Sequence, residues 1–214
     1  MLFASTVLAF TFSNVAHQSS RNSQVSEYKK YSNPGWFDNV VPTLFECTEL
    51  EEDQFAEAWV ESLILKAKAV GYLIKYGPKI EEFFGGEQQD VDNACNVDIS
   101  LHALSTYSKS FLHQFNVTCT ATAQSCEDRL GNVDDSAQMI RVCPAFFELG
   151  KYGYNSQAGT LVKLETQFND VGGTFPRGIA PEEVKELAKQ NPTLSLTTAE
   201  SYQYFAESIK YDLE

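Results

Sequence analysis

The chain has 214 residues, of which 43% are hydrophobic and 21% charged, so it is long enough for one domain with a buried core. Its formal net charge of −13 argues against nucleic acid and anionic lipid as partners, because both carry charge of the same sign. The sequence contains no internal repeat, coiled-coil heptad or phosphate-binding loop.

The first 16 residues form an apolar block without charge. The block is too short for a membrane span but suits a signal peptide, with cleavage near Ala16 to Gln18. A buried strand is the competing interpretation, because no Lys or Arg precedes the block. We expect residues 17–44 to form a flexible arm, whose apolar end could dock on the domain, and 45–214 to form a single domain.

Two helices are predicted in the first half of this domain. The capping box Thr48-x-x-Glu51 starts a helix that ends near Tyr76, before Gly77-Pro78. Its apolar stripe comprises Phe55, Trp59, Leu63, Ala67, Val70 and Ile74. A second helix is predicted over about 97–114. Its inward-facing residues are expected to be Ile99, Leu101, Leu104, Phe111 and Leu112.

Short β-rich runs follow at 117–121 and 138–143. A polar loop with Gly131-Asn132 separates them, which predicts a small hairpin or sheet edge. Asn116 begins an N-glycosylation acceptor sequence, Asn-Val-Thr.

Two further helices are predicted near the C-terminus. Pro181–Gln190 has proline near its first position. Ala199–Tyr211 follows a capping box, Thr197-x-x-Glu200. The second helix is expected to bury Tyr202, Phe205, Ala206 and Ile209.

Between these elements lies the stretch AGTLVKLETQFNDVGGT, residues 158–174. Leu161, Leu164 and Phe168 recur at helical spacing. Gly159 provides an entry bend, and Gly172-Gly173 provide the stop. The stretch therefore predicts one short helix followed by a glycine-rich turn.

This stretch resembles the metal-binding helix of the aspzincin zinc endopeptidases, the deuterolysin and peptidyl-lysine metalloendopeptidase family. The family pattern is A-G-T-L-[VI]-H-E-x-x-H-F, followed by G-G-T-x-D-x-x-Y. The segment CPAFF at 143–147, the cysteine spacing and AESYQYFAE at 199–207 resemble other family segments in the same order. The resemblance implies an α+β, zincin-like metallopeptidase fold that is mostly helical, with a small antiparallel sheet and a cleft along the former metal helix.

In the family pattern two histidines on one helix face share a Zn²⁺, and the adjacent glutamate acts on the metal-bound water. Here these positions hold Lys163, Leu164 and Gln167, while the third ligand and the assisting tyrosine fall on Pro176 and Ile179. A lysine ammonium repels a dication, and leucine, proline and isoleucine side chains have no donor atoms. We therefore expect no catalytic residue to be intact, no metal and no cofactor, the ancestral zinc having been lost.

A relocated metal site is the alternative. Glu165 is one position late in the helix, so it points about 100° away from the face of Lys163 and Gln167. The histidines of the chain are His17, His102 and His113. On one helix the last two would be about 16 Å apart, too far to share an ion. Exposed helix-face histidines are the simpler interpretation.

The chain has five cysteines: Cys47, Cys95, Cys119, Cys126 and Cys143. Their spacing resembles the deuterolysin disulfide pattern, which implies the pairs Cys47–Cys119 and Cys126–Cys143. Cys95 is left over, either as a free thiol or as an intermolecular partner. Together with the signal peptide and the glycosylation sequence, the cysteines indicate a secreted, extracellular protein.

In the lysine-specific branch of the family, two acidic side chains of the closing helix are thought to seat the substrate lysine. Glu200 keeps one of them, and Gln203 replaces the other. A plain helix cap is the competing role for Glu200. At most half of that substrate pocket is therefore expected.

Three functions are compatible with these residues. The first is a secreted, non-catalytic relative that binds an unknown protein or peptide, with Lys163 supplying a fixed positive charge for an anionic or carbonyl group. The second is an active peptidyl-lysine endopeptidase with an unrecognised or relocated site. The third is a disulfide-stapled structural protein. We expect a monomer, with Cys95 as the one candidate for pairing between chains.

Overall fold

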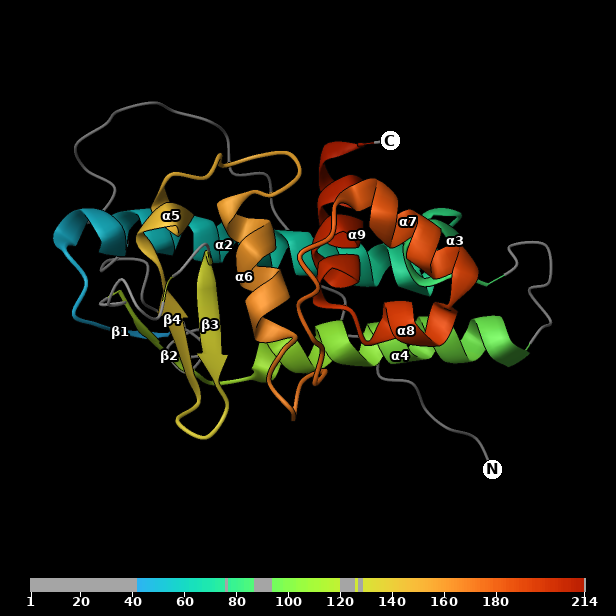
Figure 1. Ribbon diagram of the computed structural model, residues 1–214, viewed down its shortest axis with the longest axis horizontal. Coiled ribbons are helices and arrows are strands. Elements are labelled where there is room, and N and C mark those ends of the chain that lie inside the picture. The colour runs from blue at the N-terminus through green and yellow to red at the C-terminus, as the bar shows by residue number, and fades with distance from the viewer. Residues whose placement is uncertain (1–41, 76, 87–93, 120–125, 127–128, 214) are drawn as a thin grey trace.

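The computed structural model describes residues 42–75, 77–86, 94–119, 126 and 129–213. The predicted signal peptide, most of the predicted arm and His17 lie outside these residues. Within the described part, a small sheet lies at one end and a group of helices at the other (Figure 1). The long helix α2 (Glu49–Ile74) runs past both and joins them.

Helix α2 begins as the sequence predicts. Thr48 is its N-cap, and the reciprocal hydrogen bonds of the capping box with Glu51 are both formed. The predicted apolar stripe is correct for Phe55 and Trp59, and Leu63 and Val70 pack partly buried against the core, but Ile74 is 60% exposed and its predicted burial is wrong. The buried face continues instead through Ser62, Leu65, Lys66, Ala69 and Leu73.

Helix α4 (Ala94–Leu112) lies beside α2, close to the predicted range. Ile99 is buried, but Leu101 and Leu112 are 51% and 80% exposed, so their predicted inward orientation is wrong. The core contacts of α4 come from the smaller Ala103 and from Tyr107. A short helix between α2 and α4, α3 (Lys79–Phe84), was not predicted.

The sheet contains β1 (Thr43–Phe45), β2 (Asn116–Thr118), β3 (Gly131–Asp134) and β4 (Met139–Val142), in the order β1-β2-β4-β3. β1, β2 and β4 are parallel, and only β3 is antiparallel to β4. The predicted antiparallel sheet is therefore wrong for two of the three strand pairs. Gly131-Asn132 begins a strand rather than a loop. β1 also starts within the range predicted to be a flexible arm.

The C-terminal half contains α5 (Pro144–Phe147), α6 (Gln157–Glu165), α7 (Pro181–Gln190), α8 (Pro192–Leu196) and α9 (Ala199–Tyr211). The predicted ranges of α7 and α9 are confirmed. α9 is entered from Thr198, however, and its N-cap makes no side-chain hydrogen bond, so the predicted capping box at Thr197 is wrong.

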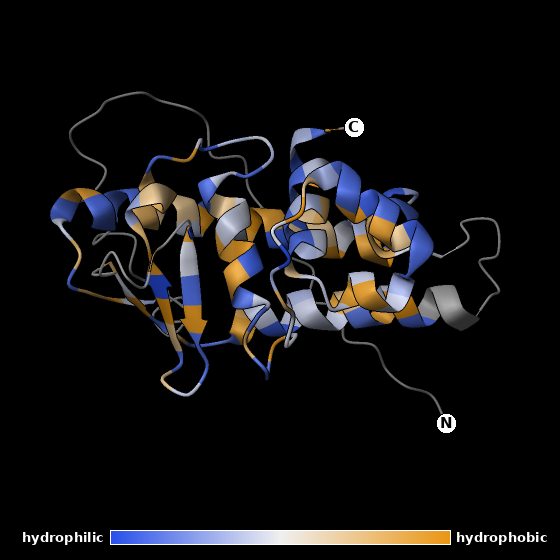
Figure 2. Ribbon diagram, in the orientation of Figure 1, coloured by the Kyte–Doolittle hydropathy of each residue, from blue (hydrophilic) through white to orange (hydrophobic). Residues whose placement is uncertain are grey.

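Two hydrophobic clusters fill the interior. One packs α2, α4 and α9 against each other, and the other packs α2 and α6 against the sheet. Figure 2 shows apolar residues along α6, which lies between the two ends of the molecule. Helix α6 contributes to both clusters, through Val162 on one side and Leu161 and Leu164 on the other.

Both disulfides implied by the family resemblance are formed. Cys47 bonds to Cys119, with their Cα atoms 4.8 Å apart, and Cys126 bonds to Cys143. Cys95 lies in the first turn of α4. Across the described residues, every helix is too short or too polar to cross a lipid bilayer.

Candidate functional site

Helix α6 and the segment that follows it carry the positions singled out in the sequence. Ser156 is the N-cap, and its hydroxyl accepts a hydrogen bond from the Gly159 N–H at 3.0 Å. Gly159 lies inside the helix, so it is not the predicted entry bend. A Cβ atom at this position would stand 1.9 Å from Oε1 of Glu207, and glycine is therefore required for α9 to approach.

The helix ends at Glu165, earlier than the predicted stop at Gly172-Gly173. The segment after it folds through turns, in which the N–H groups of Gly172 and Gly173 donate to the carbonyl of Phe168 at 3.0 and 2.8 Å. Gly173 has a φ of 56°, a conformation that favours glycine. The glycine-rich turn is thus present, but the helix before it is shorter than expected.

Lys163, at the first histidine position of the family pattern, forms an ion pair with Glu200 of α9. Its Nζ lies 3.3 Å from Oε1 of Glu200. The lysine side chain is 20% exposed and the glutamate side chain 1% exposed. The charge of Lys163 is therefore balanced within the chain and is not left for an anionic ligand.

The loop after the glycine turn closes over the same carboxylate. The N–H of Arg177 donates to both oxygens of Glu200 at 3.0 and 3.1 Å, and the N–H of Gly178 donates to Oε1 at 2.9 Å. Glu200 is thus a buried anchor that joins α6, α9 and this loop. It is not a cap of its own helix.

The other positions of the pattern lie apart from this ion pair. Leu164 is 2% exposed and packs in the core with the sheet. Gln167 donates through Nε2 to the carbonyl of Lys163 at 3.1 Å. Pro176 is on the surface, and Ile179 packs against the helical core. Gln203, one turn after Glu200, is 1% exposed.

Glu165 points away from Lys163 and forms a second ion pair in the core. Its Oε2 lies 2.6 Å from Nζ of Lys66 on α2, and both side chains are fully buried. Burial lowers the pKa of Lys66 and raises that of Glu165, while the mutual attraction opposes both shifts. The lysine also lies over the ring of Trp59, 4.8 Å from its centroid.

A third buried carboxyl group, Glu207, holds the start of α6. It accepts hydrogen bonds from the N–H and hydroxyl of Ser156, at 2.8 and 2.7 Å, and from the N–H of Asn155 at 3.2 Å. Burial raises the pKa of Glu207 to about 7, against the effect of these donors. The sequence reasoning missed Glu207 and Lys66, although Glu207 is the last residue of a segment that matches the family pattern.

Among the described residues, no three His, Cys, Asp or Glu side chains are placed to share a metal ion. His102 lies on α4, and His113 directly follows that helix. Asn116, the glycosylation candidate, lies in β2 and is half-buried, while Thr118 of the same sequence is 7% exposed. Glycosylation stays a prediction.

The fold and the α6–turn–α9 arrangement define a zincin-like domain of the metallopeptidase class. A family model described as lysine-specific metallo-endopeptidase (Aspzincin_M35) matches residues 75–207. The match covers more than half of the chain, and the chain therefore belongs to this family.

Individual relatives agree with this assignment. The chain is 27% identical over 171 residues to a peptidyl-Lys metalloendopeptidase of Grifola frondosa. The aligned region covers 76% of this chain and 45% of that protein. It is 25% identical over 167 residues to a peptidyl-Lys metalloendopeptidase of Pleurotus ostreatus, covering 78% of this chain and 96% of that protein. The chain thus spans about half the length of one relative and nearly all of the other.

A solved structure is also similar. A zinc peptidase from Grifola frondosa superposes with a TM-score of 0.64 and 24% identity, over 76% of this chain and 97% of that one. At this identity the likeness supports the fold alone. The α+β, zincin-like fold expected from the sequence is thereby confirmed, with the sheet corrected to mostly parallel.

Proposed function

We propose that this chain is a secreted, non-catalytic member of the lysine-specific metallo-endopeptidase family that binds a protein or peptide without cleaving it. The Lys163–Glu200 ion pair carries this proposal. It places an ammonium group, held 3.3 Å from a buried carboxylate, where the family pattern has a zinc ligand. Lys163 neutralises the charge of Glu200, which would otherwise attract a metal cation.

The donor set at the pattern positions does not fit zinc. Structural and catalytic zinc sites use nitrogen, oxygen or sulfur donors at about 2.0–2.3 Å, and catalytic sites have three such protein ligands. Leu164, Pro176 and Ile179 offer no side-chain donor, and the ammonium of Lys163 repels a dication. Gln167 is the one remaining pattern residue with a donor atom, and its amide is a weak substitute for an imidazole.

Secretion is supported by independent features. The two disulfides are typical of an oxidising compartment. A further relative, 32% identical over 74 residues and covering 35% of this chain and 21% of that protein, is an extracellular protease of Aeromonas hydrophila. The apolar N-terminal block and the sequence at Asn116 add to this expectation.

The test is the metal content and the peptidase activity of the purified full chain. We expect no stoichiometric zinc by elemental mass spectrometry and no chelator-sensitive cleavage of casein or of lysine-containing peptides. The peptidyl-Lys metalloendopeptidase of Pleurotus ostreatus serves as the active reference. Stoichiometric zinc together with cleavage abolished by a chelator would establish the alternative, an active endopeptidase with a relocated site.

A variant designed to bind zinc tests whether the residues at the pattern positions explain the proposed loss of the metal. Lys163→His, Gln167→His and Pro176→Asp together restore the ligand types of the pattern and leave the core residue Leu164 unchanged. We expect this triple variant to bind zinc and the unaltered chain not to. A triple variant that folds but binds no zinc would show that these positions do not explain the loss.

A further inference from the structure

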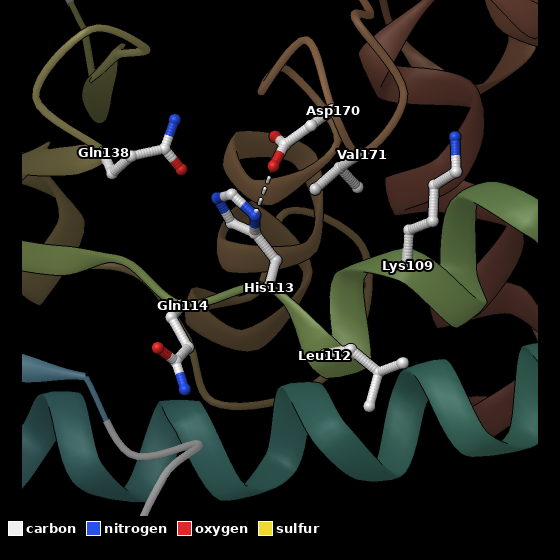
Figure 3. Close-up of a pocket in the computed structure, with 7 residues that line it drawn as sticks. All are labelled: Lys109, Leu112, His113, Gln114, Gln138, Asp170 and Val171. Atoms are coloured by element: carbon white, nitrogen blue, oxygen red, sulfur yellow. Dashed lines mark ion pairs between the residues drawn. The ribbon is translucent and has the colours of Figure 1, made fainter.

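A surface hollow of about 440 Å³ lies where the end of α4 meets the β3–β4 turn and the segment after α6 (Figure 3). We call it the His113 hollow. Its lining residues are Lys109, Leu112, His113, Gln114, Gln138, Asp170 and Val171. None of these residues takes part in the Lys163–Glu200 site.

His113 is fixed at the wall of this hollow. Its side chain is 6% exposed, and its ring lies 4.4 Å from the ring centroid of Phe168 and stacks on Phe115 at 6.0 Å. Nδ1 lies 3.2 Å from Oδ2 of Asp170. The carboxylate favours a proton on Nδ1, and in the neutral ring Nε2 then carries the lone pair.

This Nε2 atom is buried and has no hydrogen-bond partner among the described residues. Figure 3 shows it on the side of the ring that faces Gln138, opposite the nitrogen that contacts Asp170. Nearly all buried polar atoms in folded proteins have a partner, so an unpaired nitrogen beside an open hollow indicates a missing donor.

The charges around the hollow select the kind of donor. Lys109 and Asp170 have opposite signs, so the lining carries no net charge while His113 is neutral. An anion would be repelled by the lone pair of Nε2 and by the Asp170 carboxylate, and a cation would be repelled by the ammonium group of Lys109. A neutral ligand with hydroxyl groups avoids both conflicts, because a hydroxyl donates to Nε2 and also accepts from amides.

The remaining lining groups suit such a ligand. The amide of Gln138 donates to the carbonyl of Asp135 at 2.7 Å, which fixes its position at the rim. Leu112, 80% exposed, provides apolar surface for the carbon face of a ring. We propose that the His113 hollow binds a saccharide, with one sugar hydroxyl donating to Nε2 of His113.

The saccharide has two conceivable sources, the chain's own glycan or a separate one. Asn116 lies next to the hollow, because its N–H donates to the carbonyl of Gln138 at 2.8 Å. His113, Phe115 and Val117 are buried and alternate to one side, so Asn116 alternates to the other side with Gln114, which also lines the hollow. A sugar attached to Asn116 would start at the edge of the hollow.

The direct test is nuclear magnetic resonance of ¹⁵N-labelled histidine in the full chain. N-acetylglucosamine and methyl mannoside are added to the glycosylated protein and to the Asn116→Gln variant. On addition of sugar we expect the Nε2 signal of His113 to shift in Asn116→Gln, while the signal of His102, exposed on α4, stays unchanged. A shift on addition of sugar to both forms identifies a separate glycan, and a shift in Asn116→Gln alone identifies the chain's own.

Two variants separate binding from folding. His113→Phe keeps a flat ring beside Phe115 and Phe168 but removes Nε2. We expect this variant to bind sugar at least about tenfold more weakly. The backbone amide signals of Gln114 and Gln138 report the binding. Lys109→Met should leave the affinity within about twofold, because the ligand is neutral. The proposal is overturned if no sugar shifts the His113 signal in either form and the two forms have the same signal. It also fails if acetate or phosphate shifts that signal and sugars do not.

Discussion

Lys163 and Glu200 form an ion pair with a structural role at a position where the family pattern has a histidine. The glutamate is almost fully buried, and a buried carboxylate is stable only with hydrogen bonds and a nearby cation. Two backbone N–H groups supply the hydrogen bonds, and Lys163 supplies the cation. Replacement of the lysine by an apolar residue should therefore destabilise the fold.

We predict that Lys163→Met lowers the free energy of unfolding by about 2 kcal/mol, because Glu200 is left buried without its cation. The matched control is Lys151→Met. Lys151 pairs with Glu57, but both side chains are more than half exposed, so this change should cost less than about 1 kcal/mol. Urea unfolding at neutral pH measures both. Equal losses would mean that the Lys163–Glu200 pair is no stronger than a surface pair.

Glu207 gives the stability of this protein a specific dependence on pH. Its pKa is raised from 4.5 to about 7 in the folded state, so between these values the folded protein holds a proton that the unfolded chain has released. Stability is therefore fully present below about pH 4.5 and is lost as the pH rises through about 7. The shift corresponds to about 3 kcal/mol.

The Glu207→Gln variant isolates this contribution, since it keeps the shape but cannot ionise. We predict that the difference in unfolding free energy between the variant and the original chain changes by about 3 kcal/mol between roughly pH 4 and pH 8, in favour of the variant at high pH. Urea unfolding across this range gives the difference directly. Parallel curves for the two proteins would show that Glu207 keeps an ordinary pKa.

At the scale of elements, the contact between α6 and α9 depends on one glycine. We predict that Gly159→Ala destabilises the protein by about 2 kcal/mol or more, because the new Cβ would overlap the Glu207 carboxyl group. Gly71→Ala on α2 is the matched control. No atom lies within 4 Å of a Cβ at Gly71, so this change should stabilise the protein by about 0.5–1 kcal/mol. Thermal unfolding distinguishes the two, and a stabilised Gly159→Ala variant would contradict the packing.

Helices α7 and α9 could be predicted because their signals are local, whereas the short α8 between them was not predicted. Proline at the start of α7 and regular apolar spacing in α9 need no knowledge of the rest of the chain. The buried face of α2 could not be predicted in the same way. Lys66 takes a core position only because Glu165, 99 residues later, supplies its partner, and a charged residue is normally assigned to the surface.

The sheet was the other failure, for a related reason. Its strands have three or four residues, and the parallel partners β1 and β2 lie more than 70 residues apart, so neither alternation nor turn sequence reveals the pairing. In the candidate site, Lys163 and Glu200 were each identified from the family pattern. Their contact was not predicted, although a new cation beside a retained carboxylate is a signal that could have been used.

For the whole molecule, the disulfides are unevenly placed. Among the described residues, both join segments of the sheet end, namely the start of α2 to the end of β2 and Cys126 to the start of α5. The helices α7, α8 and α9 at the other end carry no disulfide and are held by packing, hydrogen bonds and ion pairs. The strands of the sheet have only three or four residues each, so the cross-links add to a short hydrogen-bonded ladder.

We predict that the two disulfides contribute unequally. Cys47–Cys119 spans 72 residues and Cys126–Cys143 spans 17, so chain entropy gives about 4 and about 3 kcal/mol. The variants Cys47→Ala/Cys119→Ala and Cys126→Ala/Cys143→Ala, compared by urea unfolding, should follow this order. Amide hydrogen exchange in the first variant should show the loss of protection mainly in β2 and β4, while α9 keeps its protection. Equal loss of protection in α9 would contradict this prediction. It would mean that the sheet and the helices unfold as one unit, coupled through their shared contacts with α2 and α6.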